Sequence, residues 1–191
     1  MGRGSCAKTR SPALRASAGF WIVACAACGA PATGVDEIGA PAAADWRDLK
    51  ARIREEFAGV DHLTIDDYLA RRAAGGVGPV LVDVRPAAEH AVSWIPGARH
   101  APLGAGFEAA LADVPRDREV VLYCSVGWRS SVAAQQLQAA GYAQVFNLEG
   151  SIFEWANRGR PLENAGGAAT RVHPYDAHWG RLLKPGLRGK P

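Results

Sequence analysis

Two unbroken apolar runs constrain the fold of this chain more than any other feature of its sequence. PVLVDVR covers residues 79–85, and EVVLYCS covers residues 119–125. Each run is short and lacks the alternation of polar and apolar residues that marks a half-exposed strand, so each predicts a strand buried on both faces. Such strands occur in parallel sheets that helices cover on either side. The chain is therefore predicted to have an α/β fold.

Helical and strand-like segments alternate around these two runs. Helices are predicted at 86–92, 106–114, 129–142 and 151–159, and further strands at 97–103 and 143–150. This order and spacing predict a mostly parallel sheet with helices on both faces.

Two more helices are predicted ahead of the first apolar run. Residues 45–60 predict an amphipathic helix, and Thr64 is placed to cap a helix that starts at Ile65. The apolar face of the first helix is formed by Trp46, Leu49, Ile53 and Phe57.

The first 24 residues differ from the rest of the chain in charge. They hold Arg3, Lys8, Arg10 and Arg15 and no acidic residue, so the other 18 of the 22 basic residues share the remaining sequence with all 19 acidic residues. The net charge of +3 therefore belongs to this leader. No basic footprint is left on the body of the chain, so no nucleic-acid partner is expected.

The leader has the pattern of an export signal. A basic start precedes the run ASAGFWIVACAACGA, which is shorter than the roughly 20 residues of a membrane span, so residues 1–24 predict a signal peptide. Within this run, Ile22-Val23-Ala24-Cys25 resembles a bacterial lipobox, with lipidation at Cys25; ordinary cleavage near Ala30 is the alternative. Residues 25–44, rich in Ala, Pro and Gly, predict a flexible tether. We expect an exported protein of the cell envelope or periplasm, with a lipid anchor in the membrane.

The stretch YCSVGWRS, residues 123–130, holds the only cysteine beyond position 28. It lies where a predicted buried strand ends and a helix begins, and there loop amides and the helix N-terminus point at a common spot. That field and Arg129 are expected to lower the pKa of the Cys124 thiol and favour a nucleophilic thiolate. A cysteine that only fills space is the alternative. The candidate binding residues are Ser125, Val126, Gly127, Trp128, Arg129 and Ser130.

Four stretches occur in the order LVDVR, EHAVSWIPGARHAPL, VVLYCSVGWRS and NLEGSIFEWANRGRPL. Together they resemble a single-domain rhodanese, of the thiosulfate sulfurtransferase family, over residues 61–163. The resemblance implies a three-layer α/β fold with a five-stranded parallel sheet, and a Cys124 that cycles between thiolate and persulfide. It leaves residues 164–191 as a C-terminal extension.

The resemblance also implies the partners of the reaction. The donor would be thiosulfate or another small sulfur anion, such as a persulfide or polysulfide, and the acceptor a thiol or cyanide. No metal or organic cofactor is expected. Two alternatives stay open: a non-enzymatic persulfide carrier or sulfur-responsive binding module, and a relative of phosphatases and arsenate reductases. Cys124 to Arg129 gives C-x4-R, one residue shorter than the C-x5-R of those enzymes, and a shorter ring better suits a single sulfur atom than a tetrahedral oxyanion.

Several positions beside the loop match the family or depart from it. Asp83 and Arg85 match its D-x-R motif, and a structural ion pair between them is favoured over a catalytic role. Ser93 and Trp94 stand where the family has Gly and His, and Ser151 replaces the last glycine of L-E-G-G. Three further residues are expected at the helix surface or strand ends rather than as catalytic acids, namely Glu89, His90 and His100.

The C-terminal extension and Trp128 complete the expectations. Trp128 is expected either to form a wall beside the entering sulfur or to be an exposed lip. No metal site is expected at His173, Asp176 and His178, because a short segment would position three ligands poorly. Apolar side chains are expected to hold the extension on the domain, namely Tyr175, Trp179, Leu182 and Leu183.

Overall fold

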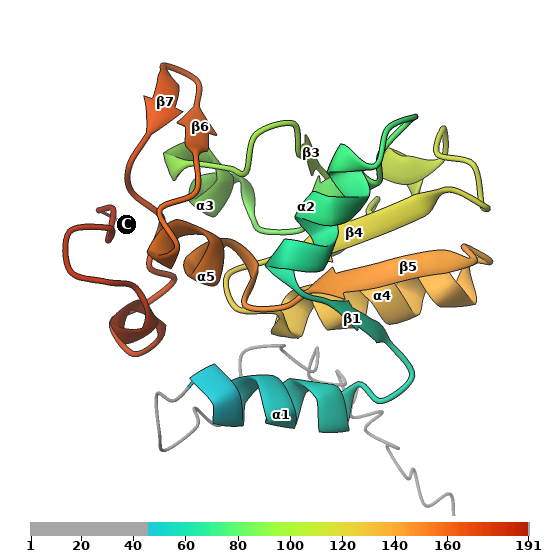
Figure 1. Ribbon diagram of the computed structural model, residues 1–191, viewed down its shortest axis with the longest axis horizontal. Helices are drawn as coiled ribbons and strands as arrows, with labels where there is room; N and C mark the ends of the chain where they lie inside the picture. The colour runs from blue at the N-terminus through green and yellow to red at the C-terminus, as the bar shows by residue number, and fades with distance from the viewer. Residues whose placement is uncertain (1–45, 191) are drawn as a thin grey trace, which may run out of the picture. The chain divides into compact units, whose positions relative to one another are not determined.

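A computed structural model describes residues 46–190 of the chain (Figure 1). The predicted signal peptide at 1–24, the predicted lipidation site at Cys25 and the predicted tether at 25–44 lie outside these residues. Within them, no helix has both the length and the apolar character that a membrane crossing requires.

A five-stranded parallel sheet forms the centre of the domain, in the order β1-β5-β4-β2-β3. This confirms the predicted α/β class and the five-stranded parallel sheet. The two apolar runs form β2 and β4, which lie next to each other inside the sheet and are almost wholly buried. The strands are β1 (Asp61–Leu63), β2 (Val80–Asp83), β3 (Arg99–His100), β4 (Glu119–Tyr123) and β5 (Gln144–Leu148).

Helices cover both faces of the sheet. Figure 1 shows α1 and α4 on one side and α2 and α5 on the other. The predicted apolar face of α1 is confirmed, because Leu49, Ile53 and Phe57 are buried, and Thr64 caps α2 by accepting a 3.1 Å hydrogen bond from the Asp67 amide. The helices are α1 (Trp46–Glu56), α2 (Ile65–Ala73), α3 (Ala87–Val92), α4 (Trp128–Ala139) and α5 (Ser151–Asn157).

The predicted helix at 106–114 is shorter than expected. Only a one-turn 3-10 helix, η1 (Ala109–Leu111), forms there. The chain enters this stretch through Gly104 and Gly106, both with positive φ, and Pro115 follows it. Because positive φ is incompatible with an α-helix and proline limits its continuation, the apolar spacing here yields turns instead.

The C-terminal extension packs on the domain as predicted. An antiparallel hairpin that the sequence did not reveal spans the predicted boundary of the extension and pairs β6 (Leu162–Asn164) with β7 (Gly167–Ala169). A second 3-10 helix follows, η2 (Trp179–Leu182). Trp179, Leu182 and Leu183 are buried, and Tyr175 is partly buried against the core.

Candidate active site

Cys124 lies directly after β4 and is 1% exposed. Its Sγ accepts a hydrogen bond of 3.2 Å from the amide of Gly127. Its own amide donates to Ser151 Oγ at 3.2 Å, and its carbonyl accepts from the amide of Ile152 in α5. The cysteine is therefore held from two sides, by its own loop and by the start of α5.

Gly127 makes this loop geometry possible. Its φ is +116°, a conformation that side chains rarely adopt, and it directly precedes α4. A Cβ at this position would lie 3.2 Å from Asn147 Nδ2 and 3.6 Å from Ile53 Cδ1. Glycine is thus required both for the turn and for the close approach of α1 and β5 to the loop, as the sequence predicted for the turn.

The surroundings of Cys124 favour the thiolate. Burial acts to raise the pKa of the thiol, but the charge of Arg129 and hydrogen bonds from Ser130 and Gly127 act in the opposite sense and leave the pKa below its ordinary value. The N-terminus of α4 points the same way, because unpaired amides and the helix dipole stabilise an anion there. The predicted activation of the cysteine therefore has a geometric basis.

Arg129 is paired with Glu89 through two parallel hydrogen bonds. Its Nη1 and Nη2 lie 2.6 and 2.9 Å from the two carboxylate oxygens, and Nη2 also donates to Ser125 Oγ at 2.8 Å. Ser125 Oγ in turn donates to Glu89 at 3.0 Å. Glu89 is 4% exposed, so the expectation of a helix-surface residue was wrong. Because the fork of Arg129 is occupied by this carboxylate, Arg129 acts on the sulfur mainly through its charge.

Tyr175 of the C-terminal extension lies against the same arginine. The guanidinium carbon of Arg129 is 4.9 Å from the centre of the Tyr175 ring. Tyr175 also has a φ of +65°, which is uncommon for a residue other than glycine. The extension therefore reaches the candidate site and contacts its cation.

Asp83 and Arg85 form the structural ion pair that the sequence favoured. Arg85 Nε and Nη2 lie 2.9 and 2.5 Å from the two oxygens of Asp83, and both side chains are fully buried. Arg85 also donates to the carbonyl of Ser93 at 2.6 Å. Asp83 Oδ2 further accepts from the Tyr123 hydroxyl at 3.0 Å. Burial acts to raise the pKa of Asp83, but hydrogen bonds from His90 and Arg85 lower it to about 2.

Aromatic rings stack beside this pair. The His90 ring lies between Trp94 at 4.6 Å and His100 at 3.9 Å, both nearly parallel to it. His90 Nδ1 is 2.9 Å from Asp83 Oδ2, and His100 Nε2 is 2.8 Å from the Arg85 carbonyl. The stack thus joins α3 to β3, and Trp94, a departure from the family pattern, is one of its layers.

Trp128 matches neither of its two expectations fully. Its ring packs edge to face on Phe57, with 5.1 Å between ring centres, and Arg52 lies 5.8 Å from it. It is partly buried against the core. Trp128 therefore ties the start of α4 to α1.

Sequence reasoning missed two polar residues of the site, and it treated a third only as a departure from the family pattern. Asn147 and Ser151 are almost fully buried and lie under the Cys124 loop, and His62 stands beside Asn147. The register of β1 and β5 was the missing signal, because it pairs His62 with Asn147 across the sheet.

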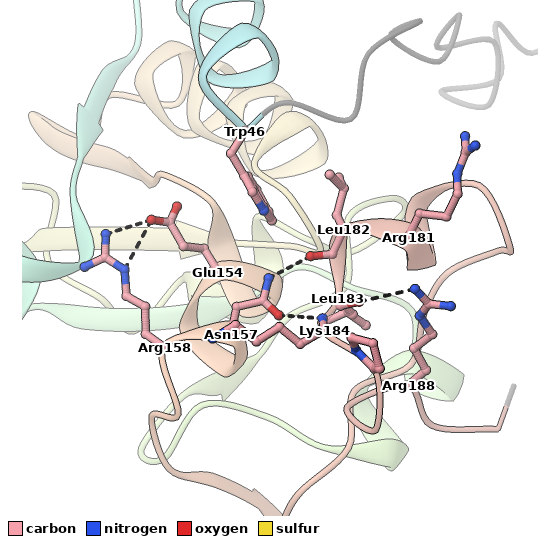
Figure 2. Close-up of a pocket in the computed structure, with 10 residues that line it drawn as sticks. Trp46, Glu154, Asn157, Arg158, Arg181, Leu182, Leu183, Lys184 and Arg188 are labelled. Carbon is pink, nitrogen blue, oxygen red and sulfur yellow. Dashed lines mark hydrogen bonds and ion pairs between the residues drawn. The ribbon is translucent and has the colours of Figure 1, made fainter.

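A hollow with a volume of about 620 Å³ lies at the start of α1. Figure 2 shows Trp46 above it and Asn157 below, with Asn157 bonded to the Leu182 carbonyl at 2.7 Å and the Lys184 amide at 2.8 Å. These bonds fix the extension on α5. Basic side chains line the hollow, namely Arg158, Arg181, Lys184 and Arg188.

Comparisons with known proteins agree with this geometry. The family model described as Rhodanese-like domain matches residues 64–158. A protein of Allochromatium vinosum named sulfurtransferase is 39% identical over 96 residues, covering 50% of this chain and 89% of that protein. The probable adenylyltransferase/sulfurtransferase MoeZ of Mycobacterium tuberculosis is 37% identical over 84 residues, which are 42% of this chain but only 21% of MoeZ.

A solved structure supports the fold alone. The crystal structure of the Alr3790 protein from Anabaena has a TM-score of 0.50 with this chain at 24% identity. The match covers 53% of this chain and 80% of the Anabaena chain.

Proposed function

This chain belongs to the rhodanese family, and on that premise we propose that it is a sulfurtransferase that works through a persulfide on Cys124. The observation that carries the proposal is the environment of the enclosed Cys124 sulfur. The sulfur accepts a hydrogen bond from the Gly127 amide, and the charge of Arg129 acts to lower the pKa of the thiol. A thiolate in that position can attack a sulfane sulfur.

The reaction has two half-steps. In the first, the Cys124 thiolate attacks the outer sulfur of thiosulfate, a new S–S bond forms, and sulfite leaves with the electron pair of the broken bond. In the second, a thiophilic acceptor attacks the outer sulfur of the persulfide and regenerates the thiolate. With cyanide as acceptor the product is thiocyanate. Both half-steps conserve charge and need no outside oxidant or reductant.

We propose that the loop residues stabilise the Cys124 persulfide more than they bind the sulfur donor. The outer sulfur of the persulfide is anionic and would be stabilised by the amides at the start of α4 and by the helix dipole. Arg129, held by Glu89, supplies a fixed positive charge at the loop. Because both Nη atoms of Arg129 are bonded to Glu89, we propose that Arg129 stabilises the anionic sulfur through its charge and does not bind the donor through a pair of hydrogen bonds.

The test is sulfite and thiocyanate production by the full-length protein and by Cys124→Ser. Turnover is expected in the wild type and in Cys28→Ser, a control that removes a thiol outside the domain, but not in Cys124→Ser. Mass spectrometry after treatment with polysulfide should show one added sulfur on Cys124. Sulfur addition without turnover would favour the persulfide carrier. An inactive protein that gains no sulfur, or one that hydrolyses phosphate esters, would overturn the proposal.

We further propose that the protein is exported and held at a membrane by a lipid on Cys25. The leader pattern supports this, and so does the basic hollow next to Trp46, where the tether joins the domain. Lys184 and Arg188 line that hollow and are exposed, with Arg188 Nη2 also donating to the Leu183 carbonyl at 3.3 Å, and exposed cations of this kind attract an anionic surface.

Expression in a bacterial host with a labelled fatty acid tests this second proposal. The label and the membrane fraction should both be lost in Cys25→Ala. A soluble periplasmic product with an N-terminus near Ala30 would contradict the anchor, and a cytoplasmic product would contradict export.

A further inference from the structure

A chain of hydrogen-bonding side chains leads from the reactive sulfur to the edge of the sheet. Ser130 Oγ lies 3.5 Å from Cys124 Sγ and 2.6 Å from Asn147 Oδ1. Asn147 Nδ2 lies 3.1 Å from His62 Nδ1. Cys124, Ser130 and Asn147 are each at most 1% exposed, so water has little access to the inner part of the chain.

Regular elements of the fold hold the side chains of this hydrogen-bond series in place. Ser130 lies in the first turn of α4, and His62 and Asn147 stand opposite each other in the register of β1 and β5. A Cβ on Gly127 would lie 3.2 Å from Asn147 Nδ2, so the amide sits directly behind the sulfur loop. The arrangement is therefore built from three elements of the fold.

The second ring nitrogen of His62, Nε2, takes no part in this series of hydrogen bonds. Nε2 is buried and has no hydrogen-bond partner within residues 46–190. A histidine usually has its tautomer fixed by the bond that the second nitrogen makes. Here that bond is missing, so the position of the His62 proton can follow what Asn147 requires.

Burial lowers the pKa of His62, and nearby groups modify it. Glu149 and a main-chain interaction with Phe57 act to raise it, although no group makes a hydrogen bond of normal geometry to Nε2 within residues 46–190. The charged groups that face the ring are Glu149, Arg54, Asp61 and Lys50.

Only two arrangements of the hydrogen atoms give every hydrogen bond between Cys124 and His62 one donor and one acceptor. The Ser130 hydroxyl has one hydrogen. If it donates to Asn147 Oδ1, its lone pairs face the sulfur, which suits a protonated thiol, and Asn147 Nδ2 donates to an unprotonated His62 Nδ1. If Ser130 instead donates to the sulfur, which suits an anion, the Asn147 amide must be turned. Its oxygen then faces His62, which must carry a hydrogen on Nδ1.

We propose that Ser130, Asn147 and His62 form a relay that sets the hydrogen bond at the Cys124 sulfur, with His62 as a positioning residue. A hydrogen on His62 Nδ1 turns the Asn147 amide, and the turned amide lets Ser130 donate to the thiolate or persulfide. No proton travels along the relay. Its members only reorient, and the thiol proton leaves to solvent.

This proposal rests on the proposed sulfur transfer for its biological meaning, but its test does not. The measured quantity is the rate of alkylation of Cys124 by iodoacetamide as a function of pH, in the full-length protein with Cys6, Cys25 and Cys28 replaced by Ser. That rate reports the thiolate whether or not thiosulfate is a substrate. Failure of the relay and failure of the sulfurtransferase reaction are therefore separable.

His62→Phe should leave Asn147 without a polar partner at β1 and favour the pattern that suits the thiol. The alkylation profile is expected to shift to higher pH by about one unit, so the rate at neutral pH falls about tenfold. His62→Asn, whose amide can donate or accept at a similar position, should restore most of the rate. Asp117→Asn, a charge change at an exposed turn that does not face His62, should leave the profile in place.

Ser130→Ala supplies the decisive comparison. If His62 acts through Ser130, His62→Phe should have no further effect on the alkylation profile in the Ser130→Ala background. Equal shifts in both backgrounds, or an unshifted profile for folded His62→Phe, would overturn the proposal. Should the Phe variant not fold, ¹⁵N NMR of the His62 ring gives the answer in the wild type. Persulfidation of Cys124 is expected to move hydrogen onto Nδ1, and an unchanged ring spectrum would overturn the relay.

Discussion

Two arginine–carboxylate pairs lie within one domain, and they differ in what surrounds them. Arg85 and Asp83 are fully buried, and Arg85 donates to Asp83 and to the Ser93 carbonyl. Arg129 and Glu89 are also bonded in a fork, but the Arg129 side chain is 12% exposed, faces Cys124 and lies against Tyr175. The guanidinium of Arg85 contacts only buried groups of the fold, whereas the guanidinium of Arg129 also lies close enough to Cys124 to lower the pKa of its thiol.

The difference teaches that the same pair of groups can support the fold or lower the pKa of a neighbouring cysteine. Burial decides which, because a fully enclosed pair can only support its neighbours, while a pair at a loop can share its charge with a sulfur. Four changes would break or sharpen this contrast.

Arg85→Met should have the largest effect on stability. Removing one partner leaves the Asp83 charge buried and unpaired, so the free energy of unfolding should fall by about 3–5 kcal/mol. Urea unfolding measures it. The double variant with Asp83→Leu should recover much of the loss, and equal losses in the single and double variants would contradict a structural pair.

Acid should weaken the fold through Asp83 next. Its pKa of about 2 lies below the ordinary value of a free aspartate, so its carboxylate stabilises the fold above about pH 4, and that contribution is lost as the pH falls toward 2. The loss is on the order of 2 kcal/mol. Asp83→Asn, though less stable at neutral pH, should show a flatter fall of unfolding free energy over this window. A fall as steep as that of the wild type would remove Asp83 as the cause.

Arg129→Met combined with Glu89→Gln, which leaves no buried carboxylate unpaired, should change the reactivity of Cys124 more than the stability of the fold. The pKa of Cys124 should rise because the positive charge that lowers it is gone, and alkylation at neutral pH should slow about tenfold. Arg129→Lys keeps the charge without the fork and should regain part of the rate. If Lys were no better than Met, the fork rather than the charge would matter.

Tyr175→Leu should have the smallest effect. It removes a cation–π contact worth about 0.5–1 kcal/mol at a partly exposed site. Thermal unfolding should show a small loss, and Tyr175→Phe should lose less than Tyr175→Leu because Phe keeps a ring against Arg129. A loss as large as that of Arg85→Met would mean that the extension carries more of the fold than its contacts indicate.

The two central strands could be predicted because each lies in a continuous apolar run that can be recognised without knowing its neighbours. β2 and β4 are confirmed where the two apolar runs lie, and α4 starts one residue before its prediction. β1 has only three residues, too few for a pattern to appear, and its place beside β5 depends on a pairing between residues far apart in the chain.

The candidate site was predicted where its residues are neighbours in sequence. Cys124, Gly127 and Arg129 share one loop, so the sequence already joins them. Glu89 was misplaced because its burial depends on Arg129, 40 positions away. No local pattern tells a buried acid from an exposed one on a short helix, so its role needed the tertiary structure.

The residues that pack around the Cys124 loop also determine which fragment of the domain would keep the loop environment intact. The family model spans residues 64–158, yet Ile53 and Phe57 approach the loop from before this range and Tyr175 contacts Arg129 from beyond it. His62 also lies outside it. A fragment trimmed to the family boundaries would keep the nucleophile but lose its surroundings on both sides. Moving the family segment alone into another protein would therefore transfer Cys124 and its loop without the side chains that surround them.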